Sequence, residues 1–109
     1  MESFPVHSVY ELEFPEFTAE ISVLSSTHLQ FEIKTGRYER TAIVNYEAIK
    51  IRSGVFVVSW QEEDRSTIVH VEDFINKKIY TFATLDDHTF IRSKGNIRFI
   101  EELNEGAHH

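Results

Sequence analysis

Short runs of alternating apolar and polar residues, each ended by turn-forming residues, restrict this chain to an all-β fold. Phe17, Ala19, Ile21 and Val23 alternate with polar residues, which is the period of a strand buried on one face. Similar runs recur about every 8–12 residues, with Gly, Ser, Asn or Asp between them. No proline occurs in residues 16–109, as is typical of continuous strands. We expect strands near residues 17–23, 29–34, 38–45, 47–52, 55–62, 67–74, 78–84, 88–93 and 97–101.

The connections between these runs are too short for helical crossovers, so consecutive strands must pair antiparallel. A sheet of this kind must close or stack to protect its edges. We therefore predict a single antiparallel up-and-down barrel of about eight or nine strands, with a β-sandwich as the alternative. An eight-stranded barrel has room inside for side chains or for one small ligand.

The length of 109 residues allows one domain. Within it we expect an N-terminal arm over residues 1–16, the barrel over residues 17–101 and a tail over residues 102–109. The segment from Ser8 to Glu16 fits either a short helical turn or an edge strand. A turn is expected at Lys94-Gly95-Asn96.

The charge balance and the missing cysteines exclude several classes of function. Eighteen acidic residues against eleven Lys and Arg give a net charge of −7, which repels nucleic-acid phosphates. Without cysteine there is no disulfide and no thiol catalysis. The longest strongly apolar run, Val55 to Val58, is far too short to span a membrane, and the start of the chain does not resemble a signal peptide. We expect a cytoplasmic protein with no membrane or nucleic-acid partner.

Metal and cofactor motifs are also missing from the sequence. The histidines before the C-terminal pair have no metal-ligand spacing, and neither a glycine-rich phosphate loop nor a Gly-x-Ser-x-Gly turn occurs. We expect no metal and no fixed cofactor. The histidines considered are His7, His28, His70 and His88.

The strand over residues 55–62 combines apolar and ionisable residues on one face. Phe56, Val58, Trp60 and Glu62 share that face by alternation. A carboxylate beside Trp60 in a dry cavity would have a raised pKa and could act as an acid or a base; the alternative is a solvated strand end. The opposite face also starts with apolar residues, so we expect this strand to be covered on both sides, for example by a partner subunit.

Two further faces combine aromatic and charged residues. Tyr38 shares one with Arg40, and Phe90 shares the other with His88 and Arg92. If these faces line one cavity, its composition is that of a small-molecule pocket. The expected ligand-contacting residues are Tyr38, Trp60, Tyr46, Tyr80, Phe56, Phe90 and Arg92.

The most specific motif is the run from Gly54 to Glu62, which ends in Ser-Trp-Gln-Glu. It resembles the MoaF-like proteins and the phenolic acid decarboxylases, two groups of lipocalin-like, calycin-type small barrels. The similarity extends upstream through residues 35–38 and 46–51, and downstream through residues 69–74 and 79–82. It covers roughly residues 17–101, and the downstream pieces are closer to the MoaF-like side.

The resemblance to the decarboxylases implies that Glu62 acts within the barrel together with an arginine, either Arg37 or Arg40. It also implies a tyrosine pair on the first strand that holds a substrate carboxylate. This chain does not match that pair, because the residue two positions after Tyr10 is Leu12.

Three functions therefore remain open. The first is a barrel that binds a small, partly apolar or aromatic ligand. The second is a cofactor-independent lyase or isomerase that uses Glu62 and an arginine. The third is a non-catalytic dimeric assembly module. A homodimer is expected in any of the three.

Overall fold

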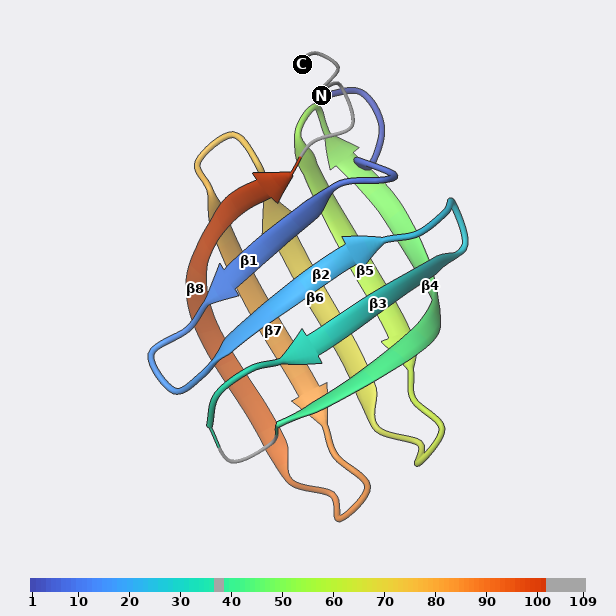
Figure 1. Cartoon of the computed structure of the whole chain (residues 1–109), viewed down its shortest axis with the longest axis vertical. Helices are drawn as coiled ribbons and strands as arrows, with labels where there is room; N and C mark the ends of the chain where they lie inside the picture. Colours follow the sequence, from blue (N-terminus) through green and yellow to red (C-terminus); the bar gives the residue numbers. More distant parts are fainter. Residues whose placement is uncertain (37–38, 102–109) are drawn as a thin grey trace.

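Eight antiparallel strands close into one barrel in the computed structural model of the chain, which describes residues 1–36 and 39–101. Each strand pairs with the next one along the sequence, and β8 returns to β1 (Figure 1). The predicted up-and-down barrel is thus confirmed, with eight strands. They are β1 (Val9–Glu13), β2 (Thr18–Val23), β3 (His28–Ile33), β4 (Arg40–Arg52), β5 (Val55–Gln61), β6 (Thr67–Asp73), β7 (Lys78–Thr84) and β8 (Phe90–Glu101).

The first strand completes the barrel. Val9–Glu13 pairs with β2 on one side and with β8 on the other, so the segment that fitted either a helical turn or a strand is a strand. Tyr10 and Leu12 are fully buried inside, whereas Glu13 is exposed. The barrel therefore begins at Val9 and not at residue 17.

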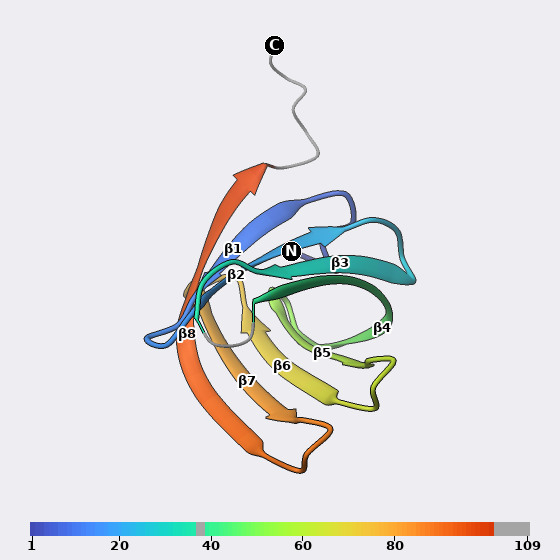
Figure 2. The ribbon, with the colours of Figure 1, turned by 60° about the horizontal axis from the view of Figure 1, so that its bottom comes forward.

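Two breaks expected in the sequence do not occur. β4 is one strand of 13 residues, and β8 is one strand of 12 residues that passes straight through Gly95. Figure 2 shows β4 bending around one side of the barrel, where its first half pairs with β3 and its second half with β5. Gly95 does not form a turn. It lets β8 pack closely against the end of β1, because a side chain at this position would meet the backbone of Glu13.

One half of the interior is filled with aromatic rings. Phe4, from the segment that precedes β1, is buried, with its ring centroid 5.4 Å from that of Tyr46 and 5.6 Å from that of Phe56. Phe74 contacts the same cluster and packs edge-to-face on Tyr10 at 5.4 Å. Such ring pairs stabilise beyond the area they bury, so this half is solid.

The outer surface of β5 to β7 is apolar. Val57, Val71 and Tyr80 lie side by side across the three strands, next to the pair Val69 and Phe82. Tyr80 and Phe82 are each 38% exposed. On the outer side of residues 55–58, Val55 is buried and Val57 is half-buried, so the described part of the chain covers only part of this side. The described residues contain no helix long and apolar enough to cross a membrane.

A methyl group at Gly95 tests the contact between β8 and the end of β1. A Cβ built there collides with the carbonyl oxygen of Glu13 and lies 2.9 Å from the Phe14 ring. We expect Gly95→Ala to lower the free energy of unfolding by about 1–3 kcal/mol, the usual cost of overpacking, in a urea titration. The neighbouring exposed position provides the control: Lys94→Ala should change the free energy of unfolding by less than about 0.5 kcal/mol. Equal stability of the two variants would contradict the close approach.

Candidate functional site

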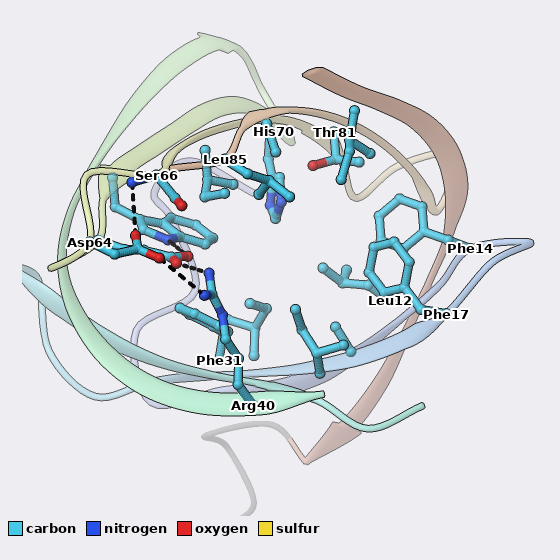
Figure 3. A pocket seen from close by; sticks show the side chains of 18 of the residues that line it. Leu12, Phe14, Phe17, Phe31, Arg40, Asp64, Ser66, His70, Thr81 and Leu85 are labelled. Carbon is cyan, nitrogen blue, oxygen red and sulfur yellow. Dashed lines mark hydrogen bonds and ion pairs between the residues drawn. The ribbon is translucent and has the colours of Figure 1, made fainter. Parts of the chain in front are cut away.

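A cavity of about 200 Å³ occupies the other half of the barrel. It lies toward the end that carries the β5–β6 and β7–β8 turns (Figures 1 and 3). An engineered apolar cavity of roughly 150 Å³ holds benzene, so this space suits a molecule with a single ring. The apolar walls come from Leu12, Phe14, Phe17, Ala19, Ile21, Phe31, Ile33, Trp60, Ile68, Ala83, Leu85 and Ile91. The polar lining residues are Arg40, Glu62, Asp64, Ser66, His70, Thr81, Asp86 and Asp87.

Glu62 lies in this cavity and not at a solvated strand end. Glu62 directly follows β5 and is 8% exposed. One carboxylate oxygen forms an ion pair with the Arg40 guanidinium, and the other accepts a hydrogen bond from Trp60 Nε1 at 3.2 Å. Arg40 on β4 therefore balances the charge of Glu62, and the indole N–H of Trp60 on β5 fixes the orientation of the carboxylate.

Arg40 is shared between two carboxylates. Its Nη1 lies 3.7 Å from Asp64 Oδ2, in addition to the contact with Glu62 (Figure 3). The backbone N–H of Ser66 donates to Asp64 Oδ1 at 2.9 Å, and this hydrogen bond lowers the pKa of Asp64. The Ser66 hydroxyl is buried and has no hydrogen-bond partner.

The charged lining is mostly acidic. Among the described lining residues, Arg40 is the one Lys or Arg, against Glu62, Asp64, Asp86 and Asp87. An anionic ligand would have to compete with Glu62 and Asp64 for Arg40. The described surroundings thus favour an uncharged ligand.

Aromatic rings form the wall beside this ion pair. Trp60 stacks on Phe31 with centroids 5.7 Å apart and an interplanar angle of 22°. The Arg40 guanidinium lies 5.5 Å from the centre of the Phe31 ring. Cation–π contact and the ion pair together hold Arg40 in place at the cavity wall.

A second polar group extends from the cavity into the filled half of the barrel. Glu72 is 1% exposed, and its Oε1 accepts a hydrogen bond from the Tyr10 hydroxyl at 2.7 Å. Its Oε2 lies 2.9 Å from His70 Nδ1. Burial, and next the nearby Glu72 charge, raise the pKa of Tyr10 well above its usual range. The Trp60 ring meets the His70 ring edge-on at 5.0 Å.

Sequence reasoning did not single out this Tyr10–Glu72–His70 chain. Alternation along residues 66–73 places Ser66, Ile68, His70 and Glu72 on one face, and that face is the buried one. The available signal was therefore a histidine and a glutamate two residues apart on an inward face. Their partner Tyr10 is 62 residues away in the sequence.

The predicted site residues separate into four groups. Glu62, Arg40 and Trp60 meet at the cavity. Tyr46 and Phe56 are buried in the filled half, where the Tyr46 hydroxyl donates to the Ser25 carbonyl oxygen at 2.8 Å. Arg37 and Tyr38 lie outside the described residues.

The remaining three residues, Tyr80, Phe90 and Arg92, are exposed and do not line the cavity. Their expected inward orientation is corrected. The inward positions of β7 are those of Ile79, Thr81 and Ala83, and Ile91 is the residue of β8 that lines the cavity. Arg92 instead lies over the exposed Phe90 ring, 5.4 Å from its centre. No group of three or more His, Asp or Glu side chains in residues 1–36 and 39–101 is arranged to hold a metal ion.

The fold and the cavity define a class of protein: a small closed up-and-down β-barrel with a pocket at one end. The MoaF-like family model matches residues 6–98, so the chain belongs to the MoaF-like family, as its sequence motifs predicted. The match begins before β1 and ends within β8, so it includes every strand.

A solved structure has the same architecture. It is the crystal structure of a protein from Burkholderia vietnamiensis that carries the name "putative beta-lactamase". The two chains are 26% identical, with a TM-score of 0.86, and the similarity covers 92% of this chain and 99% of the other. No curated protein matches this sequence.

Removing the Tyr10 hydroxyl tests whether the buried Glu72 depends on it. Tyr10→Phe leaves one carboxylate oxygen without its donor, which should cost about 1–3 kcal/mol in the free energy of unfolding, measured by urea titration. Tyr80→Phe removes a hydroxyl from an exposed ring and should cost less than about 0.5 kcal/mol. Matching losses in both variants would mean that the Tyr10 hydroxyl contributes nothing.

The raised pKa of Tyr10 also predicts a dependence of stability on alkaline pH. An unfolded tyrosine ionises at about pH 10, whereas the folded Tyr10 stays neutral at that pH. Its contribution is fully present below that unfolded pKa and is lost as the pH rises through the folded-state pKa. The wild type should therefore lose more stability than Tyr10→Phe when unfolding is measured above pH 10.

Proposed function

We propose that this MoaF-like barrel binds one small, uncharged, partly apolar or aromatic molecule in the cavity at its open end, without a fixed cofactor. The observation that carries the proposal is the cavity of about 200 Å³, whose apolar walls surround a few polar groups. Small-molecule sites have this composition. The volume fits a single-ring compound better than a pterin or a fatty acid.

Charge is the second argument for this ligand class. The arginine that could hold a carboxylate is already paired with Glu62 and lies near Asp64. An incoming anion would displace one carboxylate into an apolar surrounding, which costs several kcal/mol per unpaired ion. Uncharged ring compounds avoid this cost.

A thermal-shift comparison tests the proposal. We would compare single-ring neutral compounds with benzoates, pterins and fatty acids. A ligand at 100 times its dissociation constant stabilises the fold by about 2.7 kcal/mol, a rise in Tm of roughly 10 °C or more for a domain of this size. We expect this rise with the neutral single-ring compounds.

A cavity-filling variant shows where the ligand binds. Ala83 lines the cavity and its neighbour Thr84 is exposed. Ala83→Leu should remove the ligand-induced shift, while Thr84→Leu should retain it. A shift that survives in Ala83→Leu would place the ligand elsewhere, and a larger shift with benzoates would reverse the charge argument.

A cofactor-independent enzyme is the second candidate, because Glu62 and Arg40 meet inside the barrel as the resemblance to phenolic acid decarboxylases implies. In that case Glu62→Gln should abolish turnover of a hydroxycinnamate while the barrel stays folded by circular dichroism. Wild-type turnover in Glu62→Gln would remove Glu62 from the mechanism. The Ser-x-x-Lys motif of class A β-lactamases does not occur in this sequence, so the name of the Burkholderia protein gives no reason to propose that activity.

A homodimer and a cytoplasmic location stay predictions. The apolar outer face of β5 to β7, with Val69, Tyr80 and Phe82 exposed, supports a dimer of two copies. Light scattering after size-exclusion chromatography should then give twice the chain mass for the wild type and the chain mass for the double variant Tyr80→Lys, Phe82→Lys. A wild-type monomer would contradict the dimer.

A further inference from the structure

The strongest feature beyond ligand binding is the histidine at the cavity wall. His70 is 5% exposed, lines the cavity and is held from behind by a buried carboxylate. Figure 3 shows its ring projecting into the cavity between Leu85 and Thr81. Neither Glu62 nor Arg40 is needed to hold the ring there, since the hydrogen-bond partner behind it is Glu72.

The hydrogen bonds of Glu72 decide which ring nitrogen of His70 carries the proton. An ionised carboxylate can only accept hydrogen bonds. Tyr10 donates to Oε1 at 2.7 Å. His70 Nδ1 lies 2.9 Å from Oε2, and we assign the ring hydrogen to Nδ1 because an ionised Glu72 can only accept. In a neutral imidazole with hydrogen on Nδ1, the other nitrogen, Nε2, is an acceptor. That nitrogen lies on the side of the ring away from Glu72.

We propose that the cavity is a proton-transfer site in which Nε2 of His70 accepts the acidic hydrogen of a bound, uncharged, single-ring molecule that carries a hydroxyl group. This inference rests on the proposed ligand-binding function and deepens it. The O–H bond of the ligand breaks, its electron pair stays on oxygen, and the proton forms the new N–H bond at Nε2. His70 is the catalytic residue of this step, and Glu72 and Tyr10 are positioning residues.

The proton transfer would place an imidazolium between the Glu72 carboxylate and the ligand oxygen. The imidazolium produced lies in direct contact with the Glu72 carboxylate, and the nearest charge dominates at these distances. The other ionisable groups around the cavity are Arg40 from β4, Glu62, Asp64, Asp86 and Asp87 from the strand ends and turns, and Tyr10 from β1. Arg40 is already paired with Glu62, so the ligand oxygen anion formed by the transfer would contact the imidazolium itself. A carboxylate–histidine pair of this kind orients the base in many acid–base sites.

A coloured phenol reports the transfer directly. The probe is 4-nitrophenol, whose ionised and neutral forms have different absorption spectra, and the matched compound without an acidic hydrogen is 4-nitroanisole. We expect both to bind the full-length protein, with a rise in Tm. Bound 4-nitrophenol should ionise at a lower pH than free 4-nitrophenol, by at least about one pKa unit, a tenfold change in its ionisation constant.

Three variants distinguish the proposed base, His70, from the positioning residue Glu72. His70→Gln keeps a donor for Glu72, so it should still bind 4-nitrophenol but leave it un-ionised. Glu72→Gln can accept from Tyr10 and donate to Nδ1, which moves the ring hydrogen to Nε2; it should abolish the ionisation shift, and ¹⁵N NMR should show the changed tautomer. The control is His28→Gln, at an exposed histidine outside the cavity, which should behave as the wild type.

The outcomes distinguish this inference from the proposed function. Binding of both compounds without a shift in ionisation, or a shift that persists in His70→Gln, would overturn the proton transfer and leave ligand binding standing. Wild-type ionisation in Glu72→Gln would overturn the positioning role of Glu72. Failure of both compounds to bind would overturn the ligand class and the proton transfer together.

Discussion

The pairing of β1 with β8 is the constraint on which the rest of this structure depends. It converts a meander of eight strands into a closed barrel, so that neither β1 nor β8 is left as an open edge. The contact needs Gly95, because any side chain there would collide with the backbone of Glu13. An ion pair between Arg98 and Glu11, at 2.5 Å, joins the same two strands on the outside. Closure also brings Tyr10 of β1 to Glu72 of β6, across the interior.

The sizes of the inward side chains decide where the interior stays open. In the filled half the inward residues are large, with Phe4, Phe56 and Phe74 packed against one another. Around the cavity, several inward positions carry small residues: Ala19, Ser66, Thr81 and Ala83. A barrel of eight strands has an interior that side chains can just fill, so small residues at these positions leave a space of about 200 Å³. Phe4 packs into the filled half, whereas turn residues line the cavity at the other end of the barrel: Asp64, Asp86 and Asp87.

The alternation of apolar and polar residues was sufficient to predict the barrel, since each turn between short strands implies antiparallel pairing. It was not sufficient at the two long strands. β4 continues through Tyr46 because Val44 and Tyr46 keep the same inward alternation across the expected break, and Gly95 serves close packing instead of a turn. Faces could be separated along each strand, but the sequence did not say which face of β7 points inward. Tyr80 and Phe82 are larger and more apolar than Thr81 and Ala83, yet the smaller residues face the interior, where space is limited.

Alternation alone predicted the contact between Trp60 and Glu62. The resemblance to the decarboxylases added an arginine, Arg37 or Arg40, as a partner of Glu62. The contact of Glu72 with Tyr10 was not predicted. Trp60 and Glu62 lie two residues apart, and their hydrogen bond follows from alternation. The partners of the two buried carboxylates come from other strands, because a buried charge must find whatever donors the closed barrel brings near. Glu62 receives Arg40 from β4, and Glu72 receives Tyr10 from β1. Each carboxylate uses both oxygens, but their supports differ in kind. Arg40 is a permanent cation whose charge Glu62 neutralises, whereas His70 contacts Glu72 through Nδ1 and leaves Nε2 outside that contact. This difference makes the Arg40–Glu62 pair a fixed part of the wall and leaves His70 as the group able to exchange a proton with a bound molecule.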